Sequence, residues 1–409
     1  METHLAEFIK DTAQGREANS ILRTCVHCGF CNATCPTYQL LGDELDGPRG
    51  RIYLVKQMLE GVQPTEKTRL HLDRCLTCRA CETTCPSGVR YGRLADIGRE
   101  MLEKRVKRSF FERVKRAALR TSLANPALFN PLLALGQMVR PLLPEKSRRK
   151  IPKAAGPRAW PAIDHARKML VLEGCVQPAI APGINSAAAR VLDRLGISLV
   201  RAQGCCGAVP YHTNAHKQGL HYMRRNIDNW WPAINQGAEA LVITASGCGA
   251  MIKEYGHLLE DDPVYSAKAR RVSEIAKDIV EIVAAEKDKL GALIPHRGKR
   301  DAKTAVHSPC SLQHALKLSG AVEKLLAGCG FELTQVADSH LCCGSAGTYS
   351  ILQPELSQRL LANKLKALTS GAPDRILTAN IGCLAHLQSA TELPVKHWIE
   401  ALDESLNPA

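Results

Sequence analysis

The sequence predicts an α+β multidomain protein, with a helical N-terminal domain followed by two duplicated α/β cysteine-rich domains. Eight of the seventeen cysteines form two runs of identical spacing near the N-terminus. The second half contains two further sets of cysteines that match each other. Short β-branched strands alternate there with helix-like stretches, as in parallel α/β layers. We expect a helical domain at 1–98, a basic helical connector at 99–161, and cysteine-rich domains at 162–295 and 296–409.

Composition indicates a globular protein of two or three domains, with 409 residues of which 45% are hydrophobic. No run of 18 or more uncharged apolar residues occurs, so we expect no membrane-spanning helix. The segment Met1–Glu7 lacks the basic and apolar regions of a signal peptide, which predicts a cytoplasmic protein. Seventeen cysteines in that compartment indicate metal ligation or redox chemistry, because disulfide frameworks are rare there.

Both N-terminal cysteine runs end in proline. They read Cys25-x-x-Cys28-x-x-Cys31-x-x-x-Cys35-Pro36 and Cys75-x-x-Cys78-x-x-Cys81-x-x-x-Cys85-Pro86. This is the bacterial spacing for two [4Fe–4S] clusters, in which the fourth cysteine of each run ligates the other cluster. We therefore assign Cys25, Cys28, Cys31 and Cys85 to one cluster, and Cys75, Cys78, Cys81 and Cys35 to the second. The alternative is two zinc sites, although zinc motifs usually pair cysteines in twos.

Two helices are predicted between these runs. Residues 49–60 place Ile52, Val55, Met58 and Leu59 on one face, and residues 65–73 form a shorter helix. The module therefore resembles the α-helical ferredoxin fold, as in the iron–sulfur subunits of succinate and fumarate oxidoreductases. His27 lies between two cysteines, and we expect it either on the solvent side or behind the ligands, and not as an iron ligand, because each cluster already has four thiols.

The connector carries much of the net charge of +14, with fourteen Lys/Arg against four Asp/Glu between Arg99 and Lys150. Residues 102–119 predict one basic amphipathic helix, and residues 123–143 are nearly uncharged and interrupted by prolines. An apolar patch between basic flanks suits an anionic membrane surface. The alternative is a helical hairpin packed on this protein or a partner, and no motif supports nucleic-acid binding. Residues 153–161 resemble a linker.

The cysteines of the second half form two matching sets. The sets are Cys175, Cys205, Cys206 and Cys248, and Cys310, Cys342, Cys343 and Cys383. Corresponding positions differ by 135, 137 and 135 residues, and both central pairs read Cys-Cys-Gly. A near-constant offset over three landmarks indicates an internal duplication.

Predicted strands precede these cysteines at 169–173, 197–200, 240–244, 303–307, 331–336 and 375–379, and helices are predicted at 185–195 and 354–368. The carboxyl ends of parallel strands meet at one edge of a sheet, so four thiols in each half are expected to converge. They could ligate a further iron–sulfur cluster or act as redox thiols. The remaining alternative is that they are simply buried, which we also expect of Cys329.

Two Cys…Cys-Cys-Gly…Cys repeats behind a dicluster module resemble the iron–sulfur subunits of bacterial glycolate oxidases. The resemblance includes Cys25-Val-His-Cys-Gly-Phe-Cys, Gly47-Pro-Arg-Gly-Arg-Ile-Tyr and Asp73-Arg-Cys-Leu-Thr-Cys-Arg. It implies flavin-binding partner subunits and oxidation of glycolate to glyoxylate at the membrane. The repeats alone resemble heterodisulfide reductases, whose domains end in Cys-x-x-Cys. Here Met251 and His386 replace the last thiol, and His386 is the one that could act as a ligand.

No nucleotide-binding glycine motif occurs, so we expect neither flavin nor NAD on this chain. Removing a hydride from an alcohol needs a two-electron cofactor, which must then belong to a partner. We expect an electron-transfer subunit of a flavin-dependent 2-hydroxy-acid oxidoreductase that is not catalytic alone. It would lie on the cytoplasmic face of the inner membrane and reduce a quinone. The alternatives are a thiol–disulfide oxidoreductase, or the same subunit of a lactate or glycerol 3-phosphate dehydrogenase.

Overall fold

The computed structural model describes residues 1–154, 156, 159–294 and 302–406 of the chain. These divide into two units: unit 1 comprises Met1–Ala117 and His340–Lys364, and unit 2 comprises Ala118–Ser339 and Leu365–Ala409. A helical first unit and parallel sheets in the second confirm the predicted fold class. The predicted domain boundary at 295 and 296, and residues 155, 157 and 158 of the predicted linker, lie outside the described residues.

Short helices build the N-terminal part of unit 1. They are α1 (Ala13–Thr24), α2 (Phe30–Ala33), α3 (Pro36–Leu41), η1 (Glu44–Asp46), α4 (Pro48–Leu59), α5 (Glu66–Asp73), α6 (Ala80–Thr84) and α7 (Tyr91–Arg105). Pro48 begins α4, where a missing N–H costs nothing, and a capping box of Thr65 and Thr68 begins α5. The two helices predicted between the cysteine runs are thus confirmed, and the predicted apolar face of α4 is buried.

Helices α4 and α7 pack closely against each other. A Cβ atom on Gly98 of α7 would lie 2.4 Å from Cγ2 of Val55 in α4, so only glycine permits this approach. The contact matters for the site, because α4 carries Arg51 while α7 carries Tyr91 and Arg99. All three side chains are buried.

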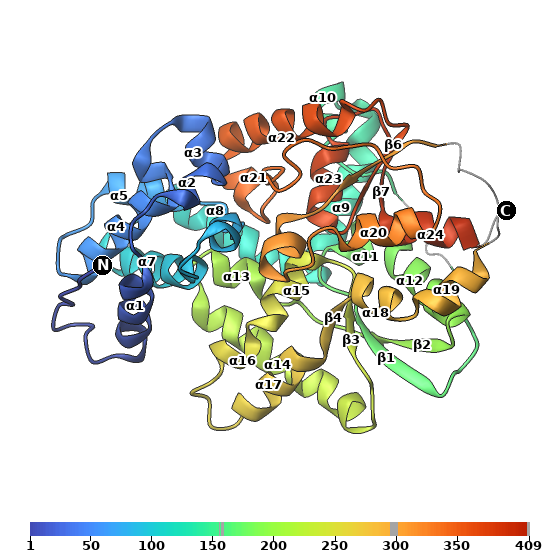
Figure 1. Cartoon of the computed structure of the whole chain (residues 1–409), viewed down its shortest axis with the longest axis horizontal. Helices are drawn as coiled ribbons and strands as arrows, with labels where there is room; N and C mark the ends of the chain where they lie inside the picture. The colour runs from blue at the N-terminus through green and yellow to red at the C-terminus, as the bar shows by residue number, and fades with distance from the viewer. Residues whose placement is uncertain (155, 157–158, 295–301, 407–409) are drawn as a thin grey trace. The chain divides into compact units, whose positions relative to one another are not determined.

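The segment His340–Lys364 of unit 1 holds the second Cys-Cys-Gly sequence, α21 (Tyr349–Leu352) and the start of α22 (Pro354–Thr369). The Tyr349 hydroxyl donates to the carbonyl of Arg74 at 3.0 Å, and Arg359 donates to that of Leu40 at 2.8 Å. In Figure 1, α22 accordingly begins beside α3. Hydrogen bonds thus attach this segment to the helices that carry the first cysteines.

Unit 2 contains two parallel sheets, of order β2-β1-β3-β4 and β5-β6-β7. The strands are β1 (Arg167–Leu172), β2 (Ile197–Ala202), β3 (Leu241–Ile243), β4 (Ala276–Asp278), β5 (Thr304–His307), β6 (Arg375–Thr378) and β7 (Val395–His397). Five predicted strands are confirmed, with small shifts at their ends. The strand predicted at 331–336 is wrong, because only a single bridge joins Thr304 to Leu333.

Helices cover these sheets. The longer ones are α12 (Gly183–Arg194), α14 (His216–Asn235), α15 (Ser246–Lys253), α17 (Ser266–Ile275), α18 (Ile279–Ala285), α20 (Ala321–Gly328), α23 (Ile381–Gln388) and α24 (Trp398–Leu406). The shorter ones are α11 (Gln177–Ile180), α13 (Ala208–His212), α16 (Tyr255–Leu258), α19 (Lys287–Leu293) and η3 (Ser311–Ala315). One core joins both sheets through α12 and α24, and a second lies beneath α14 and α17. Helices α12 and α22 confirm the two predicted there.

The carboxyl ends of the two sheets face each other within unit 2. Nε2 of His397 lies 2.9 Å from the carbonyl oxygen of Thr244, and the Ser246 N–H donates to the carbonyl of Ala379 at 3.3 Å. His397 is fully buried, and desolvation lowers its pKa to about 4. A neutral imidazole therefore joins the two sheet edges that lead to the cysteines.

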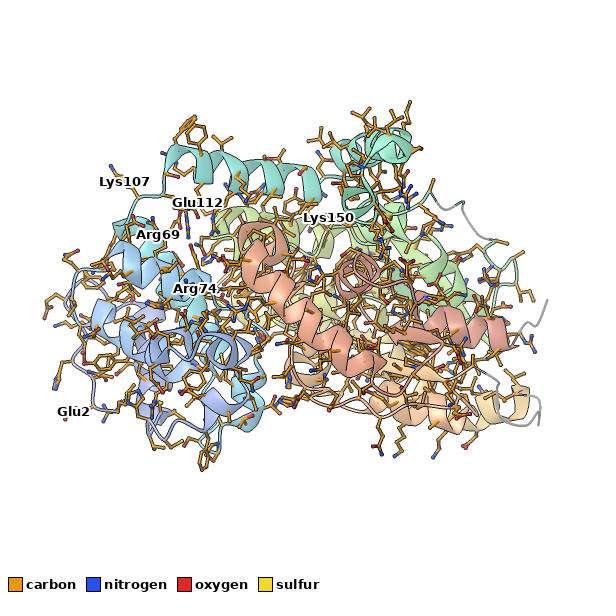
Figure 2. All side chains as sticks on the ribbon, turned by 90° about the horizontal axis from the view of Figure 1, so that it is seen from above. Glu2, Arg69, Arg74, Lys107, Glu112 and Lys150 are labelled. Atoms are coloured by element: carbon orange, nitrogen blue, oxygen red, sulfur yellow. The ribbon has the colours of Figure 1, made fainter. Side chains whose placement is uncertain are left out.

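The connector differs from the prediction. The helix predicted at 102–119 is wrong, because α7 ends at Arg105 and α8 (Phe110–Leu123) begins after a break. Arg108 lies in that break and is buried, whereas Phe110 and Phe111 are 70% and 83% exposed. Arg69 donates to the carbonyls of Val106 and Lys107, which holds the break against α5 (Figure 2).

The connector continues through α9 (Pro126–Val139), η2 (Arg140–Leu142) and α10 (Glu145–Arg148). Helix α9 buries none of its described side chains, and Leu132, Leu135 and Met138 are mostly exposed. Among the residues described by the structure, no helix combines the length and apolarity that crossing a bilayer requires.

Candidate metal centres

Two cavities in unit 1 are lined by the eight N-terminal cysteines. Cys25, Cys28, Cys31 and Cys85 line one cavity, called the outer site. Cys35, Cys75, Cys78 and Cys81 line the other, called the inner site. Cys81 also borders the outer cavity, so the two sites share a wall. The fourth cysteine of each run thus lines the same cavity as the first three cysteines of the other run.

The two cysteine loops have the same backbone conformation. His27 and Gly29 have φ values of 60° and 85°, and the equivalent Thr77 and Arg79 have 54° and 60°. Positive φ at three non-glycine residues is strained and persists only where surrounding contacts fix it. The repeated left-handed residues turn the chain so that three cysteines of each run line one cavity.

The outer site is open to solvent. Cys28 is exposed, and the neighbouring Val26 and Phe30 are 68% and 63% exposed. His27 is also exposed, with Nε2 3.3 Å from the carbonyl oxygen of Arg49, so the predicted solvent-side position is confirmed. The guanidinium of Arg49 is half-buried and paired with Glu44 at 2.8 Å.

The inner site lies beside a buried charge cluster. Arg51 is 1% exposed and donates to the carbonyl of His71 at 2.7 Å and the hydroxyl of Thr37 at 3.1 Å. Asp46, fully buried, lies 3.4 Å from Arg51 and 2.7 Å from Arg74. Two guanidinium groups therefore face one carboxylate next to this site.

Arg99 and Tyr91 hold the inner cysteine loop directly. Arg99 donates to the carbonyls of Leu72 and Cys75 and to the hydroxyl of Thr77, at 2.6–3.2 Å. The Tyr91 hydroxyl donates to Sγ of Cys75 at 3.5 Å, within the range for sulfur acceptors. These contacts fix the loop and direct positive charge at its first thiol.

The thiol pKa values differ between the outer site, which is open to solvent, and the inner site, which lies beside buried arginines. Burial raises the pKa of Cys31 at the outer site to about 11, with added repulsion from Cys25. Burial has the largest single effect on Cys75 and raises its pKa, but the charges of Arg51 and Arg99 together with hydrogen bonds from Tyr91 and Thr77 lower the pKa of that thiol overall. Four adjacent thiolates repel one another, so each site needs cationic metal to ionise fully. Sulfur-only donors of this kind suit iron–sulfur clusters or zinc.

The first cysteine set of unit 2 forms a chain of thiol contacts. The Cys205 thiol is hydrogen-bonded to Cys175 and Cys206, and Cys206 is also bonded to Cys248. Hydrogen bonds from Cys175 and Cys206 lower the pKa of Cys205, so the set favours one thiolate among four sulfurs. Asn226 donates to the carbonyl of Cys205 at 2.7 Å, which fixes the Cys-Cys loop. The predicted convergence is found in this set.

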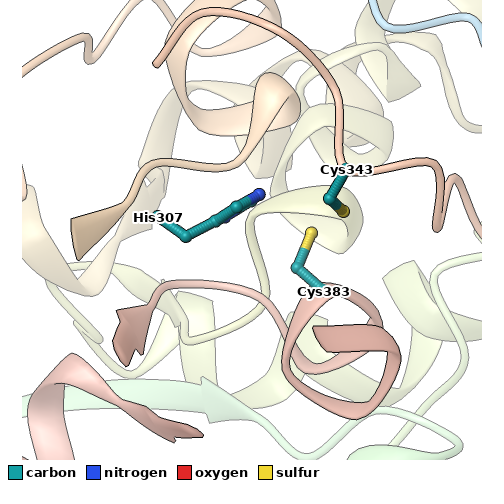
Figure 3. A group of neighbouring side chains, drawn as sticks. All are labelled: His307, Cys343 and Cys383. Carbon is teal, nitrogen blue, oxygen red and sulfur yellow. The ribbon is translucent and has the colours of Figure 1, made fainter. Parts of the chain in front are cut away.

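The second set contains a histidine that the sequence analysis missed. His307, Cys343 and Cys383 have ligand atoms that all lie within 4.8 Å of one another (Figure 3). His307 is the last residue of β5. Its position at the end of a predicted strand, three residues before Cys310, could have identified it as a candidate ligand.

The glycine after each cysteine pair has a left-handed conformation. Gly344 has φ of 86°, and a Cβ there would lie 2.6 Å from the carbonyl oxygen of Ser357. Cys329 is 4% exposed and packs in the core, which confirms its predicted burial. Met251, in place of a last thiol, is buried, whereas His386 is half-buried.

Comparison with known proteins adds independent evidence. Residues 21–89 match the family model of a 4Fe-4S dicluster domain, and residues 169–253 and 304–388 each match that of a cysteine-rich domain. The glycolate oxidase iron–sulfur subunit of Escherichia coli (strain K12) is 57% identical over 99% of this chain and 99% of that protein. A probable glycolate oxidase iron–sulfur subunit of Bacillus subtilis (strain 168) is 30% identical over 91% of this chain and 89% of its own length. A lactate utilization protein A of Exiguobacterium is 26% identical over 58% of this chain and 96% of that protein.

Proposed function

The chain belongs to the family of glycolate oxidase iron–sulfur subunits, and we propose that it passes electrons from a reduced flavin on a partner subunit to an acceptor, a membrane quinone. The substrate of the whole complex is glycolate, which is oxidised to glyoxylate. This chain is then a subunit of an oxidoreductase complex and has no activity alone.

The pair of four-cysteine cavities in unit 1 carries this proposal. Cys25, Cys28, Cys31 and Cys85 would hold one [4Fe–4S] cluster, and Cys35, Cys75, Cys78 and Cys81 a second. Such clusters accept and release one electron at a time. The left-handed residues of both loops hold the thiols in place, and the shared wall at Cys81 keeps the two sites adjacent. Hydride removal from glycolate needs a two-electron cofactor, which we assign to the partner.

Reduction of the clusters by glycolate, in the presence and absence of the partner, tests this proposal. With its flavoprotein partner and glycolate, the chain carrying about eight irons should lose its visible cluster absorption as the clusters are reduced. Without the partner, glycolate should have no effect. Reduction by glycolate without a partner would contradict the relay role, and four zinc ions in place of iron would contradict the electron-transfer function itself.

A second candidate substrate is lactate, because relatives named lactate utilization protein A cover about half of this chain. Both are 2-hydroxy acids, and the partner would select between them. Faster reduction of the assembled complex by lactate than by glycolate would favour this alternative.

The cysteines of the second half are proposed to bind a further iron–sulfur cluster or to act as redox thiols. Cys175, Cys205, Cys206 and Cys248 form the first such set, and Cys310, Cys342, Cys343 and Cys383 the second. The low pKa of Cys205 supports ligation as well as thiol chemistry, because both use a thiolate. Iron clearly above eight per chain would favour the cluster.

We also propose that the connector binds the anionic cytoplasmic surface of the inner membrane. Phe110 and Phe111 are exposed beside the exposed cations Lys107 and Arg113. Burying one phenylalanine contributes about 1.5–3 kcal/mol, so replacing both by serine should weaken binding to anionic vesicles about a hundredfold or more. Co-sedimentation measures this. Val264→Ser removes a side chain that is 64% exposed elsewhere and should have no effect; equal binding by the double variant would refute the contact.

A further inference from the structure

The surroundings of the two cysteine sites differ in charge. An electron added to either site makes it more negative, so nearby positive charge and hydrogen bonds to sulfur favour reduction. Arg51 is 1% exposed and lines the inner site, and Arg99 is 7% exposed and donates to the carbonyl of Cys75. Arg49, near the outer site, is half-exposed and paired with an exposed glutamate. Buried charges are screened much less than exposed ones.

Hydrogen bonds to sulfur also favour reduction of the inner site over the outer site. Each site has a backbone N–H group directed at a sulfur, from Thr77 to Cys75 at the inner site and from Val89 to Cys85 at the outer site. The inner site adds the buried hydroxyl of Tyr91, donated to Sγ of Cys75 at 3.5 Å. Tyr91 is 4% exposed, so water does not compete for this bond.

Two effects act in the opposite direction. Burial disfavours added negative charge at the inner site, and Asp46 neutralises part of its positive charge. Arg51 and Arg99 nevertheless give the inner site two buried guanidinium groups, of which Arg99 donates to the carbonyl of Cys75 at 2.6 Å. The outer site has the Met1 ammonium, which donates to the carbonyl of Cys25 at 2.7 Å, but it lies where solvent screens it.

We propose that Arg51, Arg99 and Tyr91 raise the reduction potential at the inner site above that at the outer site, so that the inner site takes the first electron. The inference rests on the proposed function, since both sites must carry [4Fe–4S] clusters. It gives the relay a direction, in which electrons enter at the exposed outer site and collect at the inner one. Tyr349 indicates where the path continues beyond the inner site. Its hydroxyl donates to the carbonyl of Arg74, next to Cys75, and the same chain segment contains Cys342.

The unmodified full chain provides the first test. It is reduced chemically to one electron per chain, and its electron paramagnetic resonance signal is recorded with and without a soluble dysprosium chelate. This relaxation agent acts on centres near solvent. The first electron should give a signal that the chelate hardly affects, and the second a signal that it affects strongly. The opposite order, or simultaneous uptake of both electrons, would overturn the proposal.

The variant Tyr91→Phe tests whether the hydrogen bond from Tyr91 to Cys75 raises the reduction potential at the inner site. Losing one hydrogen bond to sulfur should shift the reduction equilibrium of the inner site about three- to tenfold toward the oxidised form, and tenfold corresponds to 59 mV for one electron. Tyr53→Phe, an exposed tyrosine beside His27 at the outer site, should leave the inner site unchanged. A shift of the outer site alone in Tyr91→Phe would contradict the assignment.

Iron content monitors cluster loss in Tyr91→Phe, and the dysprosium result decides the order independently of any variant. Both measurements use a chemical reductant. Failure of glycolate to reduce the chain would therefore refute only the proposed function, whereas a reversed order would refute only this inference.

Discussion

Replacing Cys25, Cys28 and Cys31 together by alanine is expected to lower the iron content from about eight to about four per chain and to abolish electron transfer. The inner site should keep its cluster, because none of its four cysteines is replaced. Its fourth cysteine, Cys35, belongs to the altered run but is left unchanged. The remaining centre should keep a visible and paramagnetic signal. Iron and sulfide analysis with these spectra measures the result, and loss of both centres would contradict independent sites.

Crossed ligation is tested by a fourth substitution in that variant. Adding Cys35→Ala should reduce or remove the remaining iron, because Cys35 lines the inner cavity. Adding Cys85→Ala should leave it unchanged, because Cys85 lines only the outer cavity. The two variants are matched, since each removes the fourth cysteine of one run. The reverse pattern would show that each run ligates its own cluster.

The sequence predicted the cysteine sites well because ligand spacing is a local property. Three thiols within seven residues can meet only if the chain turns tightly, and the structure provides that turn through His27, Gly29 and their equivalents. The second-half strands were predictable for a similar reason, since buried parallel strands such as β1 are short apolar runs. In both cases the determining residues are neighbours in sequence.

Features set by long-range contacts were not predictable. The strands β4 (Ala-Lys-Asp) and β7 (Val-Lys-His) lack the continuous apolar run found in β3, and they exist because β3 and β6 pair with them. The predicted strand at 331–336 has the right composition, but only Leu333 bridges to the sheet. His307 resembles any other residue at a strand end, because apart from that position nothing in the neighbouring sequence distinguishes it. Tyr91 and Arg99 likewise acquire their role only when α7 packs on α4.

The helix predicted at 102–119 fails for an electrostatic reason. Its spacing places Phe110 and Val114 on an apolar face and treats every arginine as solvated. Arg108 instead lies 2.6 Å from Asp73, 2.8 Å from Glu103 and 2.6 Å from Glu112. Arg116, also buried, contacts Asp73 at 3.4 Å. A guanidinium surrounded by three carboxylates fixes the chain where a continuous helix would otherwise run.

Arg108→Ala should therefore destabilise unit 1 by about 3–5 kcal/mol, the usual cost of removing one partner from a buried charge cluster. Three carboxylates would be left close together, and Arg116 would remain as the ion-pair partner of Asp73 and Glu112. Urea unfolding followed by visible cluster absorption measures this in unit 1 specifically, because the eight N-terminal cysteines lie there.

Lys107→Ala is the matched control, since Lys107 precedes Arg108 and is exposed. It should change stability by less than about 1 kcal/mol, as expected for surface charges. Lys107→Ala should instead weaken vesicle binding, because this charge is free to face a membrane. If both variants unfolded alike, the break between α7 and α8 would owe nothing to the Arg108 cluster. If only Arg108→Ala is unstable, the connector has two kinds of basic residue, one that fixes the fold and one that faces solvent.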